Sequence, residues 1–431
     1  MSYENFITKL LNIKPSDLLS VMSSSAKDGS IILKVRLKPK ECYCHICNIP
    51  GKTHGYYQRK LTHSTLVNRQ CIIIYEQRRY KCSECGSTFS ERNPFIDTSE
   101  RVTYETKINV LKDLKQPENT YTSIAQKYNL SATKVTRIFD KHVTIKRKPL
   151  PMVLSIDEHY FPSSDYGTKY CCLFMNFQTG VMIDIIYDRK KNCLTDYFSS
   201  IKNETIDMRT LKSELDNVKY ISIDMYDTYR DIANIFFPKA KVCADSFHVL
   251  KHLTDDFRKI RLRLARNTED QTLKYLLIKF RSIFDHNKNI DNEPRYNKRL
   301  NRYVNLRDIR DIVFNAFEEL RAAYELKEYY IRLNAETTLE EAPKVIDEAI
   351  EYFESCGIEE YEEFYKMLTN WHEEIINSFT LINGKRINNS YMESKNRVLS
   401  RLIFNANGFK NFERTRNRML YCLNPDDTFR L

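Results

Sequence analysis

Hydrophobic residues in the first third of the chain change spacing several times. Apolar positions three to four apart predict a helix over residues 3–11, and the run IILKVRLK predicts a strand over 31–38. Short β-branched runs follow, and residues 70–79 are expected to form part of a β-hairpin. From about 104 to 143 the spacing is helical again. This part therefore predicts a small β-rich module followed by a helical one.

The remaining two thirds begin with α/β patterning and end in helices. Apolar runs at 152–156 and 220–223 predict short buried strands, in an α/β segment that extends to about residue 250. Long amphipathic helices are expected from 255 to 379, and a basic helical tail from 387 to 423. The pattern predicts a multidomain α+β protein. The expected divisions are 1–40, 41–98, 99–147, 148–254, 255–380 and 381–431.

Composition narrows the class of protein. The 431 residues carry a net charge of +11, which favours a polyanionic partner. No run of 18 apolar residues occurs and the first residues lack a signal-peptide pattern, so we expect a cytoplasmic protein without a membrane-spanning helix. In that compartment the 12 cysteines are expected to be thiols or metal ligands rather than disulfides.

Four cysteines form two CxxC pairs, CHIC at 44–47 and CSEC at 82–85. Each pair places two thiolates on one side of a tight turn, and two such turns complete a tetrahedral zinc site. The spacing predicts a zinc ribbon whose structural Zn²⁺ is held by Cys44, Cys47, Cys82 and Cys85. Four free thiols or a redox pair explain the repeated spacing less well. Other candidate ligands, ranked lower, are Cys42, His45, His54 and His63.

The segment TYTSIAQKYNLSATKVTRIFDKHV, residues 120–143, fits two helices around a tight turn. Ser131 is the expected N-cap of the second helix, whose inner face carries Val135 and Ile138. This pattern predicts a helix-turn-helix, although any small helical hairpin produces a similar one. The residues expected to face the major groove are Thr133, Lys134 and Arg137.

Two predicted strands each stop at an aspartate. Asp157 follows the run at 152–156, and Asp224 follows the run at 220–223. A third segment, VCADSFHVLKHL, adds Asp245 and His248 to the same expected neighbourhood. Carboxylates are the ligands that Mg²⁺ prefers, and two ions held between them can cleave a phosphodiester. The plainer interpretation is that these acids are solvated strand ends.

A third carboxylate is expected from the tail. Glu393 lies early in a predicted helix, where it is either an exposed partner of Arg397 or a third metal ligand. Trp371, in the helical region, is expected to be a core residue, with base stacking as the alternative. The expected phosphate contacts of the tail are Lys395, Arg397, Arg401, Arg414, Arg416 and Arg418.

Taken in order, the motifs resemble those of the DDE transposases of bacterial insertion sequences, of the ISL-three type. The matching motifs are the two CxxC pairs, IDE, D-x-x-D-x-Y, D-x-F-H-V, E-x-x-N-R and the arginine-rich G-F-x-N-F run. The resemblance implies a ribonuclease-H-like core interrupted by a helical insertion. It also implies strand cleavage and transfer at terminal inverted repeats, dependent on Mg²⁺ or Mn²⁺. The implied catalytic residues are Asp157, Asp224 and Glu393, with His248 as an accessory group. Ser246 stands where the family usually has a basic residue.

Three other functions fit parts of the sequence. A non-catalytic DNA-binding regulator, or an inactive copy, explains residues 42–143 but leaves the placed acids unexplained. A nuclease of the same fold would cut without joining strands, and a structural protein would use the acidic helical region. The transposase accounts for the most motifs. Its expected partners are double-stranded DNA, with the protein bound to the bacterial nucleoid, and a second copy or larger assembly.

Overall fold

The structure is a computed structural model that describes residues 3–66, 69–97, 99–163, 167–286, 288–406 and 411–431. The chain forms two compact units, residues 1–146 with 398–431 and residues 147–397. The division falls inside helix α14 (Ser390–Ala406). Among the described residues, no helix is both long and apolar enough to cross a membrane.

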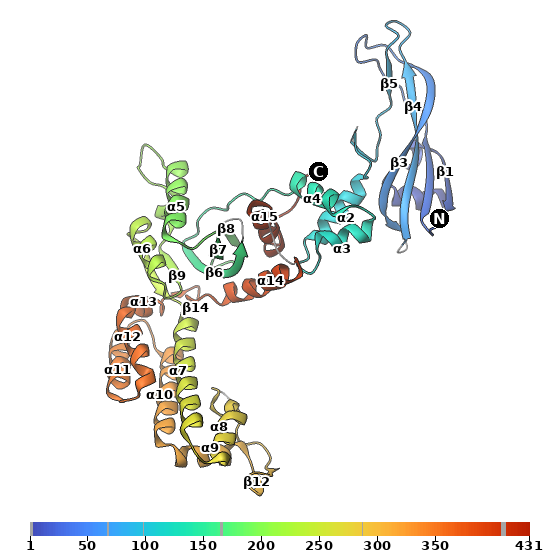
Figure 1. The fold of residues 1–431 in the computed structure, drawn as a ribbon. Helices are drawn as coiled ribbons and strands as arrows, with labels where there is room; N and C mark the ends of the chain where they lie inside the picture. The colour runs from blue at the N-terminus through green and yellow to red at the C-terminus, as the bar shows by residue number, and fades with distance from the viewer. Residues whose placement is uncertain (1–2, 67–68, 98, 164–166, 287, 407–410) are drawn as a thin grey trace. The chain divides into compact units, whose positions relative to one another are not determined.

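The first unit begins with a five-stranded mixed sheet in the order β1-β2-β4-β3, with β5 paired to β4 (Figure 1). Its strands are β1 (Leu18–Ser25), β2 (Ile31–Leu37), β3 (Lys52–Leu66), β4 (Arg69–Lys81) and β5 (Thr88–Ser90), preceded by α1 (Tyr3–Leu10) and a short 3-10 turn (Pro15–Asp17). β3 and β4 form a long antiparallel hairpin, which confirms the hairpin expected between the CxxC pairs. β1 was not predicted, because only Leu18 of this edge strand is buried.

Three helices follow the sheet, α2 (Tyr104–Leu114), α3 (Tyr121–Tyr128) and α4 (Ala132–His142). α3 and α4 are the two helices around a tight turn that the sequence predicted over residues 120–143. Asn129 ends α3 in the left-handed conformation, and the Ser131 hydroxyl accepts a hydrogen bond from the Lys134 amide to cap α4. The last helix, α15 (Phe412–Leu423), belongs to this unit, where the Tyr421 hydroxyl donates to the Leu111 carbonyl at 3.0 Å.

The second unit contains a five-stranded sheet in the order β10-β9-β6-β7-β8. Its strands are β6 (Val153–Ser163), β7 (Thr168–Asn176), β8 (Met182–Ile186), β9 (Tyr220–Ile223) and β10 (Lys241–Ala244). β6, β7 and β8 pair antiparallel, whereas β9 and β10 run parallel to β6. The expectation that the first strand ends at Ile156 was wrong: pairing with β7 carries β6 on to Ser163, first through the polar residues Asp157, Glu158 and His159.

Helices complete the second unit. α5 (Lys191–Thr205), a 3-10 turn (Glu214–Asn217) and α6 (Asp227–Phe236) belong to the sheet region. The helical stretch expected from residue 255 begins earlier, at Ser246, because the Asp245 side chain caps α7. Its elements are α7 (Ser246–Asn267), α8 (Gln271–Lys279), a 3-10 turn (Arg281–Phe284), β11 (Arg295–Asn297), β12 (Arg302–Val304), α9 (Leu306–Ala316), α10 (Glu318–Glu336), α11 (Ala342–Ser355), a 3-10 turn (Glu359–Tyr361), α12 (Glu362–Asn370) and α13 (His372–Asn377). The two-residue strands β13 (Leu381–Ile382) and β14 (Lys385–Arg386) lead into α14.

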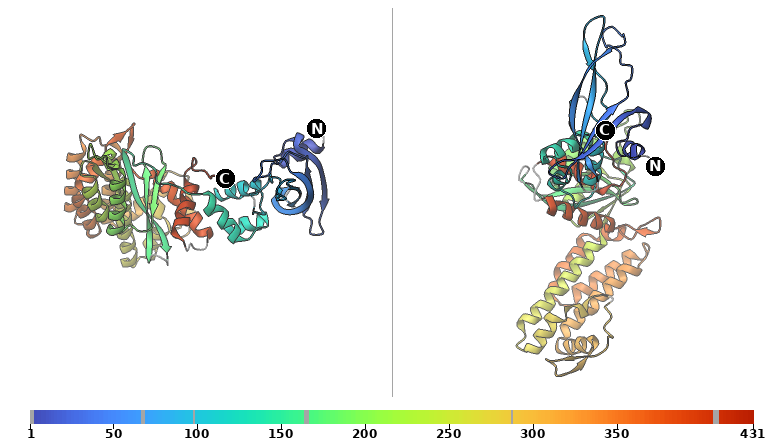
Figure 2. Two further views of the ribbon diagram at one scale, coloured as in Figure 1. Left: turned by 90° about the horizontal axis from the view of Figure 1, so that it is seen from above. Right: turned by 90° about the vertical axis from the view of Figure 1, so that its right-hand side faces the viewer.

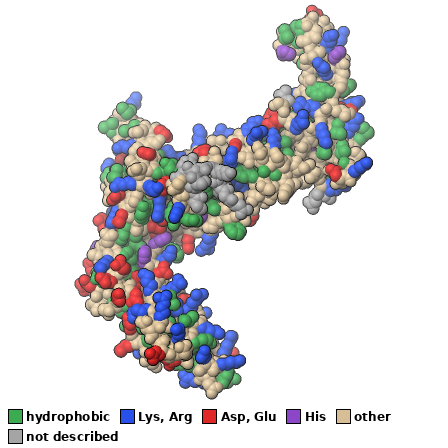
Figure 3. All heavy atoms as spheres, viewed as in Figure 1, with side chains coloured by type: hydrophobic (Ala, Val, Ile, Leu, Met, Phe, Trp, Pro, Cys, Tyr) green, Lys and Arg blue, Asp and Glu red, His purple; other side chains and the backbone are tan. Residues whose placement is uncertain are grey.

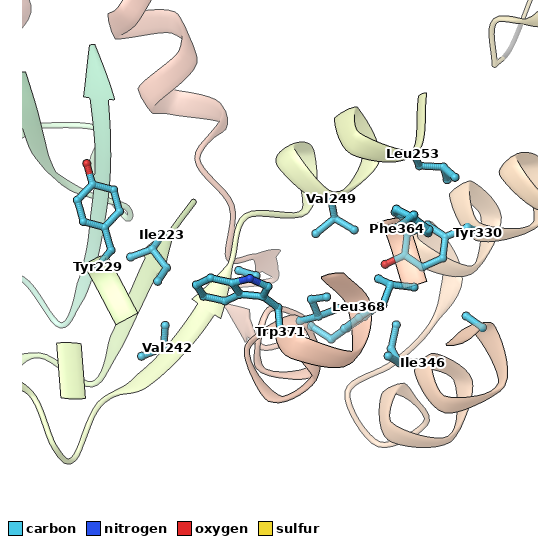
Figure 4. Close-up of a cluster of buried hydrophobic side chains, with 14 of the residues drawn as sticks. Ile223, Tyr229, Val242, Val249, Leu253, Tyr330, Ile346, Phe364, Leu368 and Trp371 are labelled. Atoms are coloured by element: carbon cyan, nitrogen blue, oxygen red, sulfur yellow. The ribbon is translucent and has the colours of Figure 1, made fainter. Parts of the chain in front are cut away.

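One continuous apolar core joins this sheet to the helical stretch. Figure 2 shows α7 and α10 side by side within that stretch. In Figure 4, Trp371 lies between side chains near the sheet, such as Val242, and side chains of the helices, such as Leu368. Trp371 is only 4% exposed, and the Arg230 guanidinium lies 4.1 Å from its ring centroid, so Trp371 is a core residue rather than an exposed base-stacking one. The core anchors α7 and β10 on either side of Asp245.

Candidate active site and zinc cluster

Three neighbouring strands bring an aspartate to the same edge of the second sheet. β6 pairs with β9 with Ser155 opposite Ser222, and the same register two residues on puts Asp157 level with Asp224. In the pairing of β9 with β10, Ile223 lies opposite Ala244. The residues that follow, Asp224 and Asp245, are therefore neighbours at the end of these two strands. Asp157 therefore lies within β6, two residues past the last residue that pairs with β9. The parallel register explains why acids that are far apart in sequence converge.

The side chains meet as the strands suggest. Carboxylate oxygens of Asp157, Glu158 and Asp224 lie within 4.8 Å of one another. The ligand atoms of Asp224, Asp245 and His248 also lie within 4.8 Å of one another. Asp224 belongs to both groups. The shared position of Asp224 makes it the centre of the site.

Burial dominates the electrostatics of these carboxyl groups. Asp157 is 7% exposed and Asp245 is 1% exposed. Burial raises the pKa of Asp157, Asp224 and Asp245, and the charges of neighbouring carboxylates raise them further. Burial also lowers the pKa of His248 to about 4, so the imidazole is neutral at pH 7 and does not offset the negative charge. The site is therefore a concentration of acid groups, and among the described residues none of Asp157, Asp224 and Asp245 forms an ion pair with a Lys or Arg side chain.

One carboxylate oxygen at the centre lacks a hydrogen bond from any described residue. Nε2 of His248 lies 3.1 Å from Oδ1 of Asp224, but without hydrogen-bond geometry, so this buried oxygen has no donor in the part of the chain that the structure describes. Burying a charged oxygen without a partner is costly, and a hard divalent cation is the partner that several converging carboxylates suit. The residues present thus fit a divalent metal ion.

Two asparagines, one just before α14 and one within it, hold the acids in place. The Asn396 amide nitrogen donates to Oδ2 of Asp157 at 2.8 Å, while its oxygen lies 3.2 Å from Nδ1 of His159. The Asn389 backbone amide donates to Oδ1 of Asp245 at 3.2 Å. Asn396 belongs to the E-x-x-N-R motif, but no feature of the sequence marked Asn389 as a partner of Asp245. Its distance in sequence from Asp245 hid the contact.

Glu158 already has protein partners. Its carboxylate forms an ion pair with Arg189 and accepts a hydrogen bond from the Tyr229 hydroxyl at 2.9 Å. Both carboxylate oxygens of Glu158 are therefore occupied by protein donors, although the group lies beside Asp157 and Asp224. Its contribution to the cluster is mainly negative charge beside Asp157.

Glu393 lies beside this cluster but outside both groups of ligand atoms found among the described residues. Its side chain is 45% exposed, and its carboxylate lies 3.7 Å from the Arg397 guanidinium. It nevertheless lines the same cavity, which has a volume of about 470 Å³. Other residues that line this cavity are Asp157, Asp224, Asp245, His248 and Asn396.

The four cysteines of the CxxC pairs come together in the first unit. Their sulfur atoms lie within 4.8 Å of one another, with 3.6 Å between Cys44 and Cys85. Tetrahedral ligation at a Zn–S distance of about 2.3 Å requires sulfur atoms about 3.8 Å apart, so the cluster fits Zn²⁺. Asn48 and Gly86, which follow the two pairs, both have positive φ, at 54° and 70°. The two turns thus have matching backbones, as a zinc ribbon requires.

The lower-ranked ligands lie outside this sulfur cluster. His63 is buried, with Nδ1 3.0 Å from the Thr103 hydroxyl, and the His45 ring packs on Phe89. Cys42 and His54 do not belong to any metal-ligating group among the described residues. The four-cysteine set is therefore the zinc site that the structure supports.

The expected DNA-facing residues differ in exposure. Thr133 and Arg137 of α4 are exposed, and Lys134 is half-buried. Arg397 and Arg401 of α14 are exposed, although Arg401 pairs with Glu118 at 3.0 Å. The half-buried Lys395 lies on the same helix.

The arginines of α15 are engaged within the first unit. Arg414 makes a bidentate ion pair with Asp140, at 2.7 and 2.8 Å. Arg416 donates to the Ile145 carbonyl at 2.9 Å. Arg418 is 3% exposed and donates to the carbonyls of Gln116 and Asn119 at 3.1 and 2.9 Å. These contacts give the arginine run a structural role in packing α15 against the helix-turn-helix.

Comparison with known protein families supports the assignment of these acids to a catalytic domain. No curated protein matches the chain. A family model described as a transposase, of the DDE ISL-three (ISL3) group, matches residues 154–419, which is more than half of the chain and includes all the acids of the cavity. The chain therefore belongs to the DDE transposases of the ISL-three type.

Proposed function

We propose that the protein binds the terminal inverted repeats of an insertion sequence, cleaves the DNA strand at the element end and transfers that strand to a target. One observation carries the proposal. Three adjacent strands deliver Asp157, Asp224 and Asp245 to one buried edge, where an Asp224 oxygen has no hydrogen-bond donor among the described residues. Such a cluster of buried acids destabilises the fold, and a structural protein or a simple DNA-binding regulator has no need for it.

Asp157 and Asp224 are the proposed ligands of Mg²⁺ or Mn²⁺. When bound, such ions lower the pKa of an attacking water and stabilise the charge of the departing oxygen. Asn396 fixes the orientation of Asp157 through the hydrogen bond at 2.8 Å. Asp245 adds negative charge from β10, and its hydrogen bond from Asn389 ties the start of α14 to the site.

Glu393 is the proposed third ligand. From its place on the cavity wall it would reach the cluster after its ion pair with Arg397 is broken, and a DNA phosphate is a competing partner for that arginine. The His248 ring, neutral at pH 7, is proposed as an accessory group that accepts a proton at Nε2, the nitrogen nearest Asp224.

DNA recognition is proposed for helix α4 of the first unit and for two exposed arginines of α14. Helix α4 presents Thr133 and Arg137 to solvent, as a recognition helix would in the major groove. Arg397 and Arg401 are the proposed phosphate contacts on α14. The core sheet, with three antiparallel strands followed by two parallel ones, supports the ribonuclease-H-like architecture that the resemblance implies. Because two element ends must be joined, we propose a dimer or larger assembly on DNA.

The test uses labelled duplexes that carry the element ends and flanking DNA, incubated with the full chain and Mg²⁺. A transposase yields both nicks at the element end and joined products with a second duplex. A nuclease yields nicks alone, and a regulator yields a bound complex that is not cut. Absence of cleavage with Mg²⁺ and with Mn²⁺, on DNA that is bound, would refute the proposal.

The non-catalytic alternative has one observation in its favour, the position of Glu393 outside the ligand group. If Glu393 does not join the site on DNA, Glu393→Gln will leave every DNA-dependent activity unchanged. If the proposal holds, Glu393→Gln will abolish cleavage and leave the affinity for the element end within about twofold.

A further inference from the structure

The helical stretch of the second unit is divided by charge. Residues 258–310 contain fifteen Lys or Arg and six Asp or Glu, whereas residues 336–374 contain thirteen Asp or Glu and two Lys. Figure 3 shows the Lys and Arg side chains gathered around the end of α7 and α10 where Figure 1 labels β12. None of these basic residues belongs to the acid cavity or the helix-turn-helix.

A small antiparallel hairpin forms part of this basic end. β11 and β12 pair with Tyr296 opposite Tyr303, while Asn297 and Val304 are buried. Tyr296 is 51% exposed and Tyr303 is 71% exposed, with ring centroids 5.4 Å apart. The hairpin therefore turns one face inward and presents two aromatic rings to solvent.

The turn of the hairpin is held by its own side chains. Oδ1 of Asn297 accepts hydrogen bonds from the amides of Arg299 and Leu300, at 2.9 and 3.2 Å. The Tyr296 hydroxyl donates to Oδ1 of Asn301, which has a φ of 50°. These bonds fix the backbone without using the charged side chains of the turn, so a partner does not have to order it.

Four cations project from this rigid turn and its two strands. The segment 295–302 has no acid, and among the described residues none of its cations forms an ion pair. By contrast, nearby Arg307 makes a bidentate ion pair with Asp291. The exposed cations are Arg295, Lys298, Arg299 and Arg302. Uncompensated cations beside exposed aromatic rings are the combination that binds the phosphates and bases of a polynucleotide.

We propose that the β11–β12 hairpin is a second DNA-contacting surface, separate from the helix-turn-helix, that binds DNA phosphates without reading sequence. The inference rests on the proposed function, since a transposase must hold DNA beyond the repeat that it recognises. β-ribbons contact DNA in other folds, and the spacing of four cations over eight residues suits a phosphate backbone. An acidic protein surface, such as 336–374 of a second copy, is the competing partner.

The experiment measures affinity of the full chain for a duplex of unrelated sequence and for a single strand, as a function of salt. The variant combines Lys298→Ala, Arg299→Ala and Arg302→Ala. A matched control combines Lys202→Ala, Lys212→Ala and Lys219→Ala, which removes three exposed cations from other parts of the same unit. Thermal unfolding of both variants checks that the fold is retained.

Each lost phosphate contact reduces the steepness of log affinity against log salt by about 0.9 for duplex. The loss of affinity relative to the unaltered protein is therefore about eightfold greater at 0.1 M than at 1 M salt for each contact. The hairpin variant is therefore expected to lose a slope of roughly 2–3, and the control none. A reduced salt slope on the duplex identifies flanking or target duplex as the ligand. A reduced salt slope on the single strand alone identifies a displaced single strand as the ligand. Equal slopes for the hairpin and control variants on both probes would overturn the proposal.

Two further outcomes separate this proposal from others. If sedimentation shows that the hairpin variant loses self-association while the salt slope stays unchanged, the hairpin binds the acidic surface and the proposal is overturned. Failure of the proposed function is seen independently, as an absence of nicking by the unaltered protein, because the salt slope is measured without cleavage.

Discussion

Replacing Asp224 by asparagine is expected to stabilise the protein when no divalent cation is present. Asp224 is the carboxylate common to both acid groups, with ligand oxygens of its neighbours within 4.8 Å. Two unit charges at that distance repel by about 3.5 kcal/mol at an effective dielectric constant of 20. Since the raised pKa values mean that protons already relieve part of this repulsion, we expect a gain of about 1–3 kcal/mol.

The gain should depend on pH in a defined direction. Asp224 has a raised pKa in the folded state, so the folded protein binds the proton more tightly than the unfolded chain. The stability that this proton confers is present at low pH and is lost as the pH rises above the ordinary aspartate value of 3.8 towards the folded value. The difference between Asp224→Asn and the unaltered protein is therefore larger at pH 8 than at pH 5.

The assay is thermal unfolding in a chelator and in excess Mg²⁺, followed by calorimetry. For a unit of this size, 1 kcal/mol corresponds to roughly 2–4 °C in Tm. At tenfold excess over its Kd, Mg²⁺ should stabilise the unaltered protein by about 1.4 kcal/mol and the variant by much less. The matched control is Asp227→Asn, which changes an exposed acid that pairs with Arg230.

Two results would refute this reasoning. One is a lower Tm for Asp224→Asn than for the unaltered protein in chelator at pH 8. The other is an equal response of both proteins to Mg²⁺, because that would mean that the cation binds elsewhere.

Three other predictions concern the first unit. Arg418→Ala should lower the free energy of unfolding by about 2–4 kcal/mol in a denaturant titration, since it removes a buried guanidinium and its hydrogen bonds to two carbonyls. The exposed Arg401→Ala should change it by under about 0.5 kcal/mol, and equal effects would contradict the structural role of Arg418. Cys47→Ala should reduce the zinc content measured after dialysis from one equivalent towards none, and retention of a full equivalent would exclude Cys47 as a ligand. Burial opposes ionisation of Glu100, but the ammonium groups of Lys107 and Lys141 lower its pKa below the usual 4.5, so the stability that this carboxylate contributes is lost as the pH falls below 4.5. Glu100→Gln should therefore flatten the dependence of the free energy of unfolding on pH in that range, and an unchanged dependence would argue against the ion pairs.

The features that local sequence determines were predictable. The two CxxC turns, the Ser131 cap and strand β9 all depend on residues close together in the chain, and each has the expected form. The convergence of Asp157 and Asp224 was also predictable, because parallel neighbouring strands carry equivalent ends to one edge.

The features that depend on distant packing were not predictable. Asp157 lies in mid-strand because β7 continues its pairing beyond the apolar run. Arg418 looks like a DNA contact in a basic helix, yet its side chain is buried against carbonyls of residues 116 and 119, about three hundred positions earlier. The Asn389–Asp245 hydrogen bond likewise joins segments that only the fold brings together.

The most direct test of the central claim is cleavage of an element-end duplex by Asp157→Asn and by the unaltered protein, at equal DNA occupancy and with Mg²⁺. The substitution keeps the size of the side chain and removes its charge. The account predicts nicking at the element end by the unaltered protein and a loss of at least a thousandfold in the variant, with DNA affinity unchanged. Cleavage at the same rate by both proteins would contradict the claim that the acids of β6, β9 and β10 form the active site.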